Sequence, residues 1–193
     1  MDAVKINAEI SGFILAGGKS KRMGTDKALL KIQNEPLLKR ILDLINPFCD
    51  SIKISGNNIG YADFGAPIIS DSFMGCGPIA GIYSCLLHSS TEWNLILGVD
   101  LPFLNVELIE YLISGVGDFD CIIPKHNSGI EPLAGLYHVR ILPEVEKMIQ
   151  SGDYKLMNML GKLNTRYLDC AYLVEKYPRL FTNLNRPEDY HSI

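Results

Sequence analysis

The sequence predicts an α/β fold of three layers, α/β/α, with a mainly parallel, Rossmann-like sheet at its centre. Short apolar runs that suit buried strands alternate with amphipathic segments that suit helices along most of the chain. The 193 residues are 47% hydrophobic and 21% charged, which is enough apolar material for one core. Neither a Ser/Pro/Gly-rich linker nor an internal repeat divides them. We therefore expect one domain over residues 1–193, with residues 1–8 as a loose N-terminal extension.

Strand and helix alternate through the first half of the chain. The apolar run 12–16 ends at Gly17-Gly18 and is typical of a buried strand that enters a loop. A helix follows, in which five apolar residues recur at helical spacing before Pro47: Leu37, Leu38, Ile41, Leu42 and Ile45. Residues 51–55 and 67–70 are the next predicted strands. Pro78 suits the first turn of a second helix, whose apolar face comprises Ile79, Ile82, Tyr83, Leu86 and Leu87.

The second half continues the alternation. We predict strands over 94–98, 120–124, 133–139 and 165–169. Helices are expected over 106–113, 143–149 and 155–160, and a terminal helix is expected to start at 187–190. Parallel strands joined by helices require helices on both faces of the sheet.

Charge and cysteine usage exclude several classes of function. The net charge of −4 and the pI near 5.5 disfavour sequence-independent binding to nucleic acid. No apolar run approaches the roughly 20 residues of a membrane span, and the N-terminal stretch has no signal-peptide core. The five cysteines are scattered without a CxxC pair. We expect a cytoplasmic protein with reduced thiols and no membrane association.

The loop after the first strand concentrates glycine and positive charge. Gly17, Gly18 and Gly24 allow backbone amides to approach a phosphate, and four of the 18 basic residues fall within nine positions: Lys19, Lys21, Arg22 and Lys27. Ligands of open α/β sheets bind beyond the carboxyl ends of the strands, where this loop is expected. It does not match a Walker A loop, because Phe13 stands where the first glycine is needed, and it does not match the dinucleotide fingerprint. The alternative is a solvated basic turn.

Two aspartates follow predicted strands and are expected at the same edge of the sheet. Asp100, in GVDLPFL, suits a magnesium ion that bridges substrate phosphates; its alternative role is to cap the turn before Pro102. Asp71, in IISDSF, is either a ligand-binding or a capping residue. Gly77 and Pro78 stand at a predicted helix start, whose free amides can face an anion.

The segment LAGGKSKRMGTDKALL, residues 15–30, resembles the signature of the molybdenum cofactor guanylyltransferases, which have the nucleotide-diphospho-sugar transferase type of fold. The resemblance implies that the backbone of Leu15, Ala16 and Gly17, with Gly18 beside it, frames the guanine of GTP. It implies that Arg22 meets the polyphosphate and that Lys27 binds the triphosphate and neutralises the pyrophosphate leaving group.

The later motifs extend the resemblance. It implies that Asp100 holds Mg²⁺, with Mn²⁺ as an alternative, and that Asp71, Gly77 and Pro78 contact the nucleotide. Ser55 stands where the family commonly has asparagine, with Asn57 as the alternative. The second-substrate pocket is assigned to Glu131 and Pro132 of EPLAGLY and to Asn183 and Asn185 of NLNRPEDY, where Arg186 replaces the usual threonine. The alternative for the two asparagines is the metal shell, and Asn185 is alternatively a helix cap.

The predicted reaction is transfer of GMP from GTP to the phosphate of molybdopterin, with release of pyrophosphate. The nucleophile is already an anion, so catalysis by Arg22, Lys27 and Asp100 with the metal would need no general base. The alternatives are a CTP-dependent molybdopterin cytidylyltransferase, a sugar-phosphate or polyol nucleotidyltransferase, and a silent nucleotide-binding protein. The doubled glycine of LAGG favours guanine. A molybdoenzyme or its chaperone is the expected recipient of the product.

Overall fold

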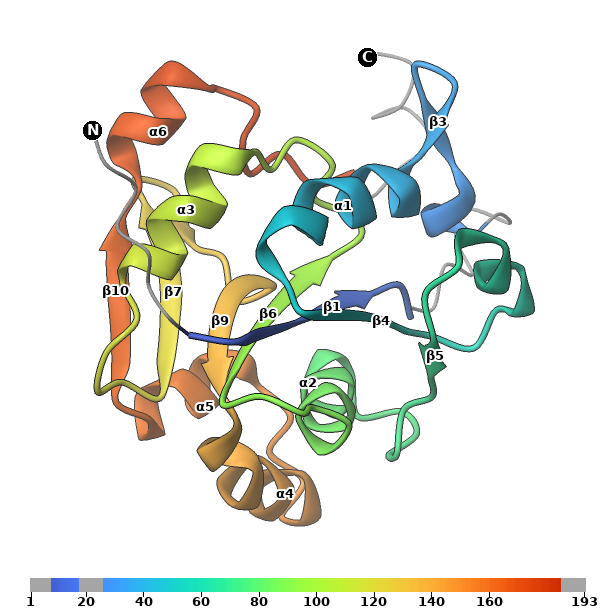
Figure 1. Cartoon of the computed structure of the whole chain (residues 1–193). Helices are drawn as coiled ribbons and strands as arrows, with labels where there is room; N and C mark the ends of the chain where they lie inside the picture. Colours follow the sequence, from blue (N-terminus) through green and yellow to red (C-terminus); the bar gives the residue numbers. More distant parts are fainter. Residues whose placement is uncertain (1–7, 18–25, 185–193) are drawn as a thin grey trace.

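The computed structural model describes residues 8–17 and 26–184, and in them one mixed sheet lies between two layers of helices (Figure 1). The sheet has eight strands in the order β10-β7-β9-β6-β1-β4-β5, with β8 paired to β7. The predicted α/β class and three-layer arrangement are confirmed. Ala8 already packs against the core, although the sequence places it in the N-terminal extension.

The strands of the sheet are mainly parallel, as predicted. They are β1 (Ile10–Leu15), β4 (Ser51–Ser55), β5 (Ile68–Ile69), β6 (Trp93–Gly98), β7 (Cys121–His126), β8 (Gly129–Ile130), β9 (Ala134–His138) and β10 (Thr165–Asp169). β1 pairs in parallel with both β4 and β6, β4 with β5, and β7 with β10. β9 is antiparallel to β6 and β7, and β8 is antiparallel to β7.

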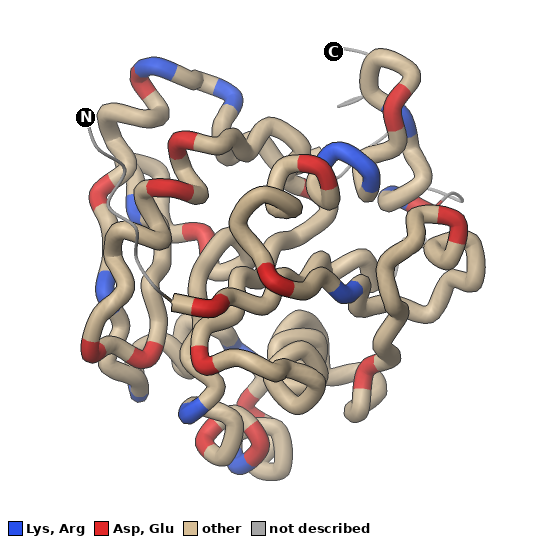
Figure 2. The backbone as a smooth tube through the Cα atoms, viewed as in Figure 1, with Lys and Arg blue, Asp and Glu red and all other residues tan. Residues whose placement is uncertain are grey.

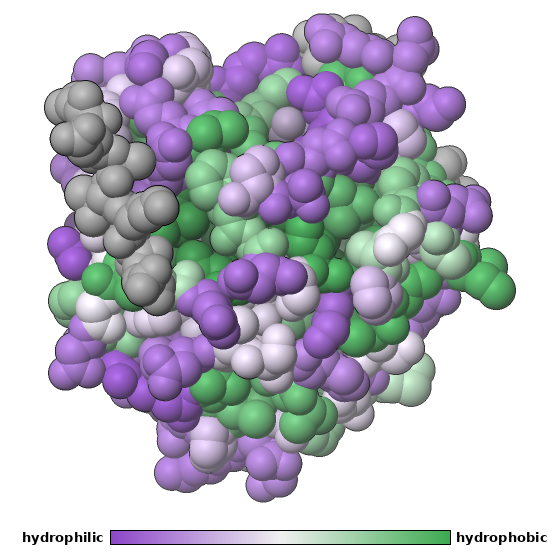
Figure 3. All heavy atoms as spheres, in the orientation of Figure 1, coloured by the Kyte–Doolittle hydropathy of each residue, from purple (hydrophilic) through white to green (hydrophobic). Residues whose placement is uncertain are grey.

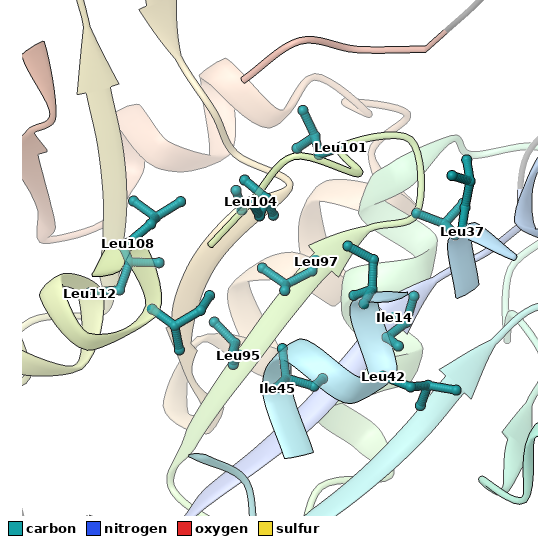
Figure 4. Close-up of a cluster of buried hydrophobic side chains, with 14 of the residues drawn as sticks. Ile14, Leu37, Leu42, Ile45, Leu95, Leu97, Leu101, Leu104, Leu108 and Leu112 are labelled. Carbon is teal, nitrogen blue, oxygen red and sulfur yellow. The ribbon is translucent and has the colours of Figure 1, made fainter. Parts of the chain in front are cut away.

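Helices cover both faces of the sheet, as Figure 1 shows. One face carries α1 (Leu37–Ile45), α3 (Val106–Ser114) and α6 (Ala171–Lys176), and the other carries α2 (Pro78–Leu87), α4 (Leu142–Gln150) and α5 (Leu156–Lys162). Each face has its own apolar core. In the first core, side chains from α1 and α3 meet those of β1 and β6, among them Ile14, Leu42, Leu95 and Leu108 (Figure 4).

Shorter elements connect these layers. Four 3-10 helices are present in the described chain: η2 (Lys27–Leu29), η3 (Asn46–Phe48), η4 (Ile59–Phe64) and η5 (Val139–Ile141). A small hairpin joins β2 (Lys31–Ile32) to β3 (Glu35–Pro36). Its turn residues, Gln33 and Asn34, have φ angles of 53° and 67°. Positive φ at both central residues is what the type I′ turn of a two-residue hairpin requires.

The predicted apolar face of α2 is wrong in one respect. Leu87 is 49% exposed, whereas all residues from Ile79 to Leu86 are buried. The helix is enclosed because it lies between the sheet and α4, so burial extends around it and stops only at its last turn. The hairpin and α6 were not predicted, and the expected terminal helix at 187–190 lies outside the described residues.

The surface carries both signs of charge. Lys and Arg are interspersed with Asp and Glu along the described backbone, and one face of the molecule shows polar side chains around smaller apolar areas (Figures 2 and 3). Within residues 8–17 and 26–184, no helix has the length and apolar content needed to cross a membrane.

Candidate functional site

The ends of three neighbouring parallel strands define one edge of the sheet. Leu15, the last residue of β1, is in register with Ser55 on β4 and with Gly98 on β6. The segments that leave these strands therefore start side by side. They contain the residues for which the sequence predicts a nucleotide site, and they lie where α/β sheets bind ligands.

Asp100 follows β6 by two residues and has a partly buried carboxylate beside a lysine. Burial raises the pKa of Asp100, while the ammonium of Lys27 and a backbone hydrogen bond act in the opposite direction. Lys27 is near enough for its charge to act on Asp100, so two of the predicted catalytic residues, which are 73 positions apart in the sequence, lie at the same edge. A carboxylate and an ammonium here can together bind a metal–phosphate group.

Asn183 reaches the same carboxylate from the other end of the chain. With its amide nitrogen toward Asp100, it donates to Oδ2 at 2.8 Å and to the main-chain oxygen of Asp100 at 3.2 Å. The amide of Leu184 also donates to that main-chain oxygen, at 3.0 Å. The structure thus brings together Asp100 and Asn183, which the sequence assigned to metal binding and to the second substrate.

The segment 179–184, here called the C-terminal strap, is held against the site by apolar and aromatic contacts. The guanidinium carbon of Arg179 lies 3.9 Å from the ring centroid of Phe103, and Phe181 stacks on His126 with centroids 4.7 Å apart. Leu180 and Leu184 are each 1% exposed. Burial of these leucines and the ring contacts fixes the backbone that carries Asn183.

Glu131 joins the same cluster through a histidine. His126 Nε2 lies 3.1 Å from Glu131 Oε1, so the ring that Phe181 covers also contacts one of the predicted second-substrate residues. The main-chain oxygen of Pro132 accepts a hydrogen bond from the Tyr137 hydroxyl at 2.5 Å. The next residue, Leu133, accepts from the amide of Gly98 at 2.7 Å, which ties this turn to the end of β6.

Ser55 is buried at the end of β4 and contacts Asp71. Ser55 is 1% exposed, and its hydroxyl donates to Oδ1 of Asp71 at 3.2 Å. Its main-chain oxygen accepts from the amides of Ala16 and Gly17 at 2.9 and 3.1 Å. Asn57, the alternative to Ser55, is exposed. These contacts make Ser55 a support for the strand edge and for the Asp71 carboxylate.

The turn before α2 contains two glycines in a left-handed backbone conformation. Gly75 and Gly77 have φ angles of 78° and 71°, a left-handed region that favours glycine, and Pro78 occupies the first turn of α2. Three predicted site residues, Gly18, Arg22 and Asn185, lie outside the described part of the chain.

The donors around Asp100 fit a metal that takes most of its ligands from substrate and water. Among residues 8–17 and 26–184, no group of three or more His, Cys, Asp or Glu side chains could hold a metal on its own. If the amide of Asn183 is rotated, its oxygen takes the position 2.8 Å from Asp100 Oδ2. Adjacent ligands of an octahedral Mg²⁺, each about 2.1 Å from the ion, are about 3 Å apart. Asp100 and Asn183 can therefore supply two hard oxygens to one magnesium ion.

Several residues at this edge were missed by sequence reasoning. Asp26, Asn58 and Tyr61 form a partly buried polar cluster next to Lys27, and His126 and Phe181 support the strap. Asp26 lies within the glycine-rich signature, but its partners come from η4 and its flank, which carry no recognised motif. The histidines form no ligand pattern in the sequence, so nothing local pointed to His126.

A lysine and two aspartates at the carboxyl ends of parallel strands are what a nucleotide-binding α/β protein of the nucleotidyltransferase class requires. The chain belongs to the family of the MobA-like NTP transferase domain, whose model matches residues 12–167. It is 35% identical over 184 residues to the molybdenum cofactor guanylyltransferase of Vibrio vulnificus (strain YJ016), covering 93% of this chain and 92% of the relative. Over 185 residues it is 32% identical to the probable molybdenum cofactor guanylyltransferase of Flavobacterium johnsoniae, covering 95% and 96%.

Solved structures agree with this family. The molybdopterin-guanine dinucleotide biosynthesis protein A from Archaeoglobus fulgidus superposes with a TM-score of 0.79 at 27% identity, covering 94% of this chain and 95% of that one. Rv0371C from Mycobacterium tuberculosis H37Rv, solved in complex with manganese, has a TM-score of 0.60 at 16% identity, covering 91% and 100%. The second likeness shows a shared fold.

Proposed function

We propose that this enzyme transfers GMP from GTP to the phosphate of molybdopterin and releases pyrophosphate. The observation that carries the proposal is that Asp100 lies within the electrostatic influence of Lys27 at the edge where β1 and β6 end. The relatives named molybdenum cofactor guanylyltransferase, which align with nearly the whole chain, support the choice of substrates.

The residues divide the work between the nucleotide and its charge. Lys27 faces the triphosphate and stabilises negative charge on the departing pyrophosphate, and Arg22 is assigned the same polyphosphate. The turns at Ala16–Gly17 and Gly77–Pro78, with Asp71, frame the base and ribose. Bond formation joins a molybdopterin phosphate oxygen to the α-phosphorus of GTP, and the bond from that phosphorus to the bridging oxygen of pyrophosphate breaks. The attacking oxygen is already an anion, so no residue has to remove a proton.

A divalent metal at Asp100 is part of the proposal, with Asn183 as a second oxygen donor. Magnesium bound there would neutralise and orient the phosphates of GTP. The charge and partial burial of Asp100 support a cation, and so does the protein of the same fold that was solved with manganese.

The second substrate is placed on the strap side of Asp100. Asn183 is held beside Asp100 by the strap, and Glu131 contacts His126, whose ring packs on the strap. Both side chains carry groups that hydrogen-bond a polar ring system such as a pterin. Asn185 is assigned to the same pocket. Transfer of the product to a molybdoenzyme or its chaperone, and a cytoplasmic location, stay predictions.

The test is a measurement of pyrophosphate release with each of the four nucleoside triphosphates, molybdopterin and Mg²⁺. We expect turnover with GTP and its loss in Asp100→Ala and Lys27→Ala, with thermal stabilisation by GTP in the wild type. Preference for CTP would show a cytidylyltransferase. Binding without pyrophosphate release would show a silent nucleotide-binding protein and overturn the enzymatic proposal.

A further inference from the structure

A buried tyrosine of η4 joins the two chain segments that flank residues 18–25. Tyr61 is 2% exposed, and its hydroxyl lies 2.8 and 3.0 Å from the two carboxylate oxygens of Asp26. The same hydroxyl lies 3.2 Å from the main-chain oxygen of Ala16. Ala16 directly follows β1, and Asp26 directly precedes Lys27. One side chain therefore contacts the segments before and after the basic glycine-rich region.

The Tyr61 hydroxyl donates its single hydrogen bond to the carboxylate of Asp26. A tyrosine hydroxyl has one hydrogen to donate, and a carboxylate is a stronger acceptor than a peptide carbonyl. Burial, followed by the hydrogen bond and the charge of Asp26, raises the pKa of Tyr61, so the hydroxyl stays protonated and keeps donating. The contact is thus a charge-assisted hydrogen bond inside the protein.

Asn58 completes the surroundings of the carboxylate. Its Nδ2 donates to Oδ2 of Asp26 at 2.6 Å, while its Oδ1 accepts from the amide of Gly60 at 2.9 Å. Asp26 also accepts from the amide of Ala28 at 3.0 Å and so caps η2, the short helix that starts at Lys27. The carboxylate therefore receives three donors, two of them from side chains more than 30 residues away in the sequence.

The packing around Tyr61 shows that the chain makes room for this arrangement. A Cβ at Gly56 would lie 2.7 Å from Cε2 of the Tyr61 ring, which is too close for any side chain. Gly56, the residue after β4, therefore has to be a glycine because the Tyr61 ring occupies the space that a side chain would need. A tyrosine ring placed this tightly holds its hydroxyl at a fixed point.

We propose that Asp26, Asn58 and Tyr61, here called the Asp26 clasp, are positioning residues that set the backbone of Lys27 for binding the triphosphate. This inference rests on the proposed function. A lysine side chain is flexible, so its charge is useful for catalysis only where its backbone is fixed close to the phosphates. The clasp fixes that backbone one residue away, and the Tyr61 hydroxyl also contacts Ala16, the residue that follows β1, without any of the three side chains having to touch the nucleotide.

The first test compares Tyr61→Phe with the wild type. Phenylalanine keeps the ring, so the variant is expected to fold, and loss of a hydrogen bond to a charged group is expected to lower its melting temperature by several degrees. Loss of a hydrogen bond to a charged group is expected to lower kcat/KM for the nucleoside triphosphate about tenfold or more. Tyr111→Phe, on α3 against the ring of Tyr172, is the matched control and is expected to retain kcat/KM.

The second test reverses the polar pair. Asn58→Asp keeps the acceptor for the Gly60 amide but places a second carboxylate against Asp26, so kcat/KM is expected to fall further than in Tyr61→Phe. The exchange Asp26→Asn with Asn58→Asp puts one amide and one carboxylate back in contact, and we expect it to regain at least part of that loss. No recovery in the exchanged variant contradicts a clasp.

The third test asks whether the clasp acts through Lys27. The affinity for the triphosphate is measured by calorimetry for Tyr61→Phe in the wild-type and Lys27→Ala backgrounds. A fall in the wild-type background that disappears in the Lys27→Ala background supports the proposal. An equal fall in both backgrounds, or a lower melting temperature with unchanged kcat/KM, shows a role confined to folding and overturns it.

The outcome for the clasp is separate from the outcome for the base. All variants are assayed with whichever nucleoside triphosphate the wild type prefers. A preference for CTP therefore corrects the proposed function, and the clasp is then judged by the ratio of kcat/KM in the variant to kcat/KM in the wild type, both measured with CTP. A wild type that binds none of the four triphosphates overturns both.

Discussion

Gly98 offers a way to move the Asp100 carboxylate without removing it. Gly98 is the last residue of β6, and a Cβ there would lie 2.7 Å from Oδ1 of Asp100 and 3.4 Å from Cβ of Leu133. Ordinary van der Waals contacts of a Cβ begin at 3.4 Å, which the distance to Leu133 meets, whereas the distance to the carboxylate oxygen is 0.7 Å shorter. In Gly98→Ala the carboxylate, which is the flexible end of a side chain, has to move by about that amount or rotate away.

The expected loss of activity follows from this displacement. A reacting group misplaced by 1 Å can cost about 100-fold, so we expect kcat/KM to fall about 10- to 100-fold. That corresponds to about 1.4 to 2.7 kcal/mol of transition-state stabilisation. The effect on folding should be small, because alanine loses less backbone entropy on folding than glycine, by up to about 0.5–1 kcal/mol, which offsets the new contact. The melting temperature should change by no more than about 2–4 °C.

Gly12→Ala is the matched control on the adjacent strand. Its Cβ would lie 2.8 Å from Sγ of Cys49 and 2.9 Å from Cδ1 of Ile45, in the core beneath α1. Overpacking of this kind costs about 1–3 kcal/mol of stability, so this variant should melt earlier but retain kcat/KM per folded molecule. The assay is pyrophosphate release with GTP and molybdopterin over a magnesium titration, paired with calorimetry. Wild-type turnover and an unchanged magnesium dependence in Gly98→Ala would refute the reasoning.

Three further substitutions probe the site by other routes. Burial raises the pKa of Asp100 in the folded protein above its ordinary value of 3.8. The protonated carboxyl therefore stabilises the fold fully below pH 3.8, and this stability is lost as the pH rises through the raised pKa of the folded state. Asp100→Asn should therefore melt above the wild type at pH 7 without metal in calorimetry, and a fall in its melting temperature contradicts this. Ser55→Ala removes the 3.2 Å hydrogen bond to Asp71 and should lower kcat/KM for GTP about two- to tenfold in steady-state assays, whereas an unchanged value shows that Asp71 is held without it. Phe181→Ala removes the ring stacked on His126 and should raise KM for molybdopterin at least about threefold with little change in KM for GTP; equal changes in both contradict a strap that serves the second substrate.

Local sequence patterns were sufficient to set the bounds of several elements. The strands at 51–55 and 165–169 have the predicted bounds, and α1 covers the predicted apolar stripe from Leu37 to Ile45. The direction of β9 and the all-round burial of α2 were not predictable in this way. Both depend on which elements lie next to them, and an apolar run reads the same in a parallel or an antiparallel strand.

The candidate site shows the same division. The signature around Lys27 and the position of Asp100 after a strand were visible in the sequence, because each is a short motif. Tyr61 and Asp26 are 35 residues apart, and His126 and Phe181 are 55 apart, so only folding brings them into contact. Ser55 illustrates a third case: the resemblance implies a nucleotide contact for it, which stays a prediction, and the structure adds a contact of its buried hydroxyl with Asp71.

The supports of the site are arranged around Asp100 in a way that suits a reaction without a general base. On one side, the amides of Ala16 and Gly17 are bonded to Ser55, and the Asp26 clasp holds the residue before Lys27. On the other side, the strap presses Asn183 onto the carboxylate. In the proposed reaction the attacking phosphate needs no activation, so the rate would depend on how accurately two anionic substrates and the neutralising charges are placed. Substitutions that keep every charged group but shift its support, at Gly98 or Tyr61, should therefore lower the rate while the protein stays folded.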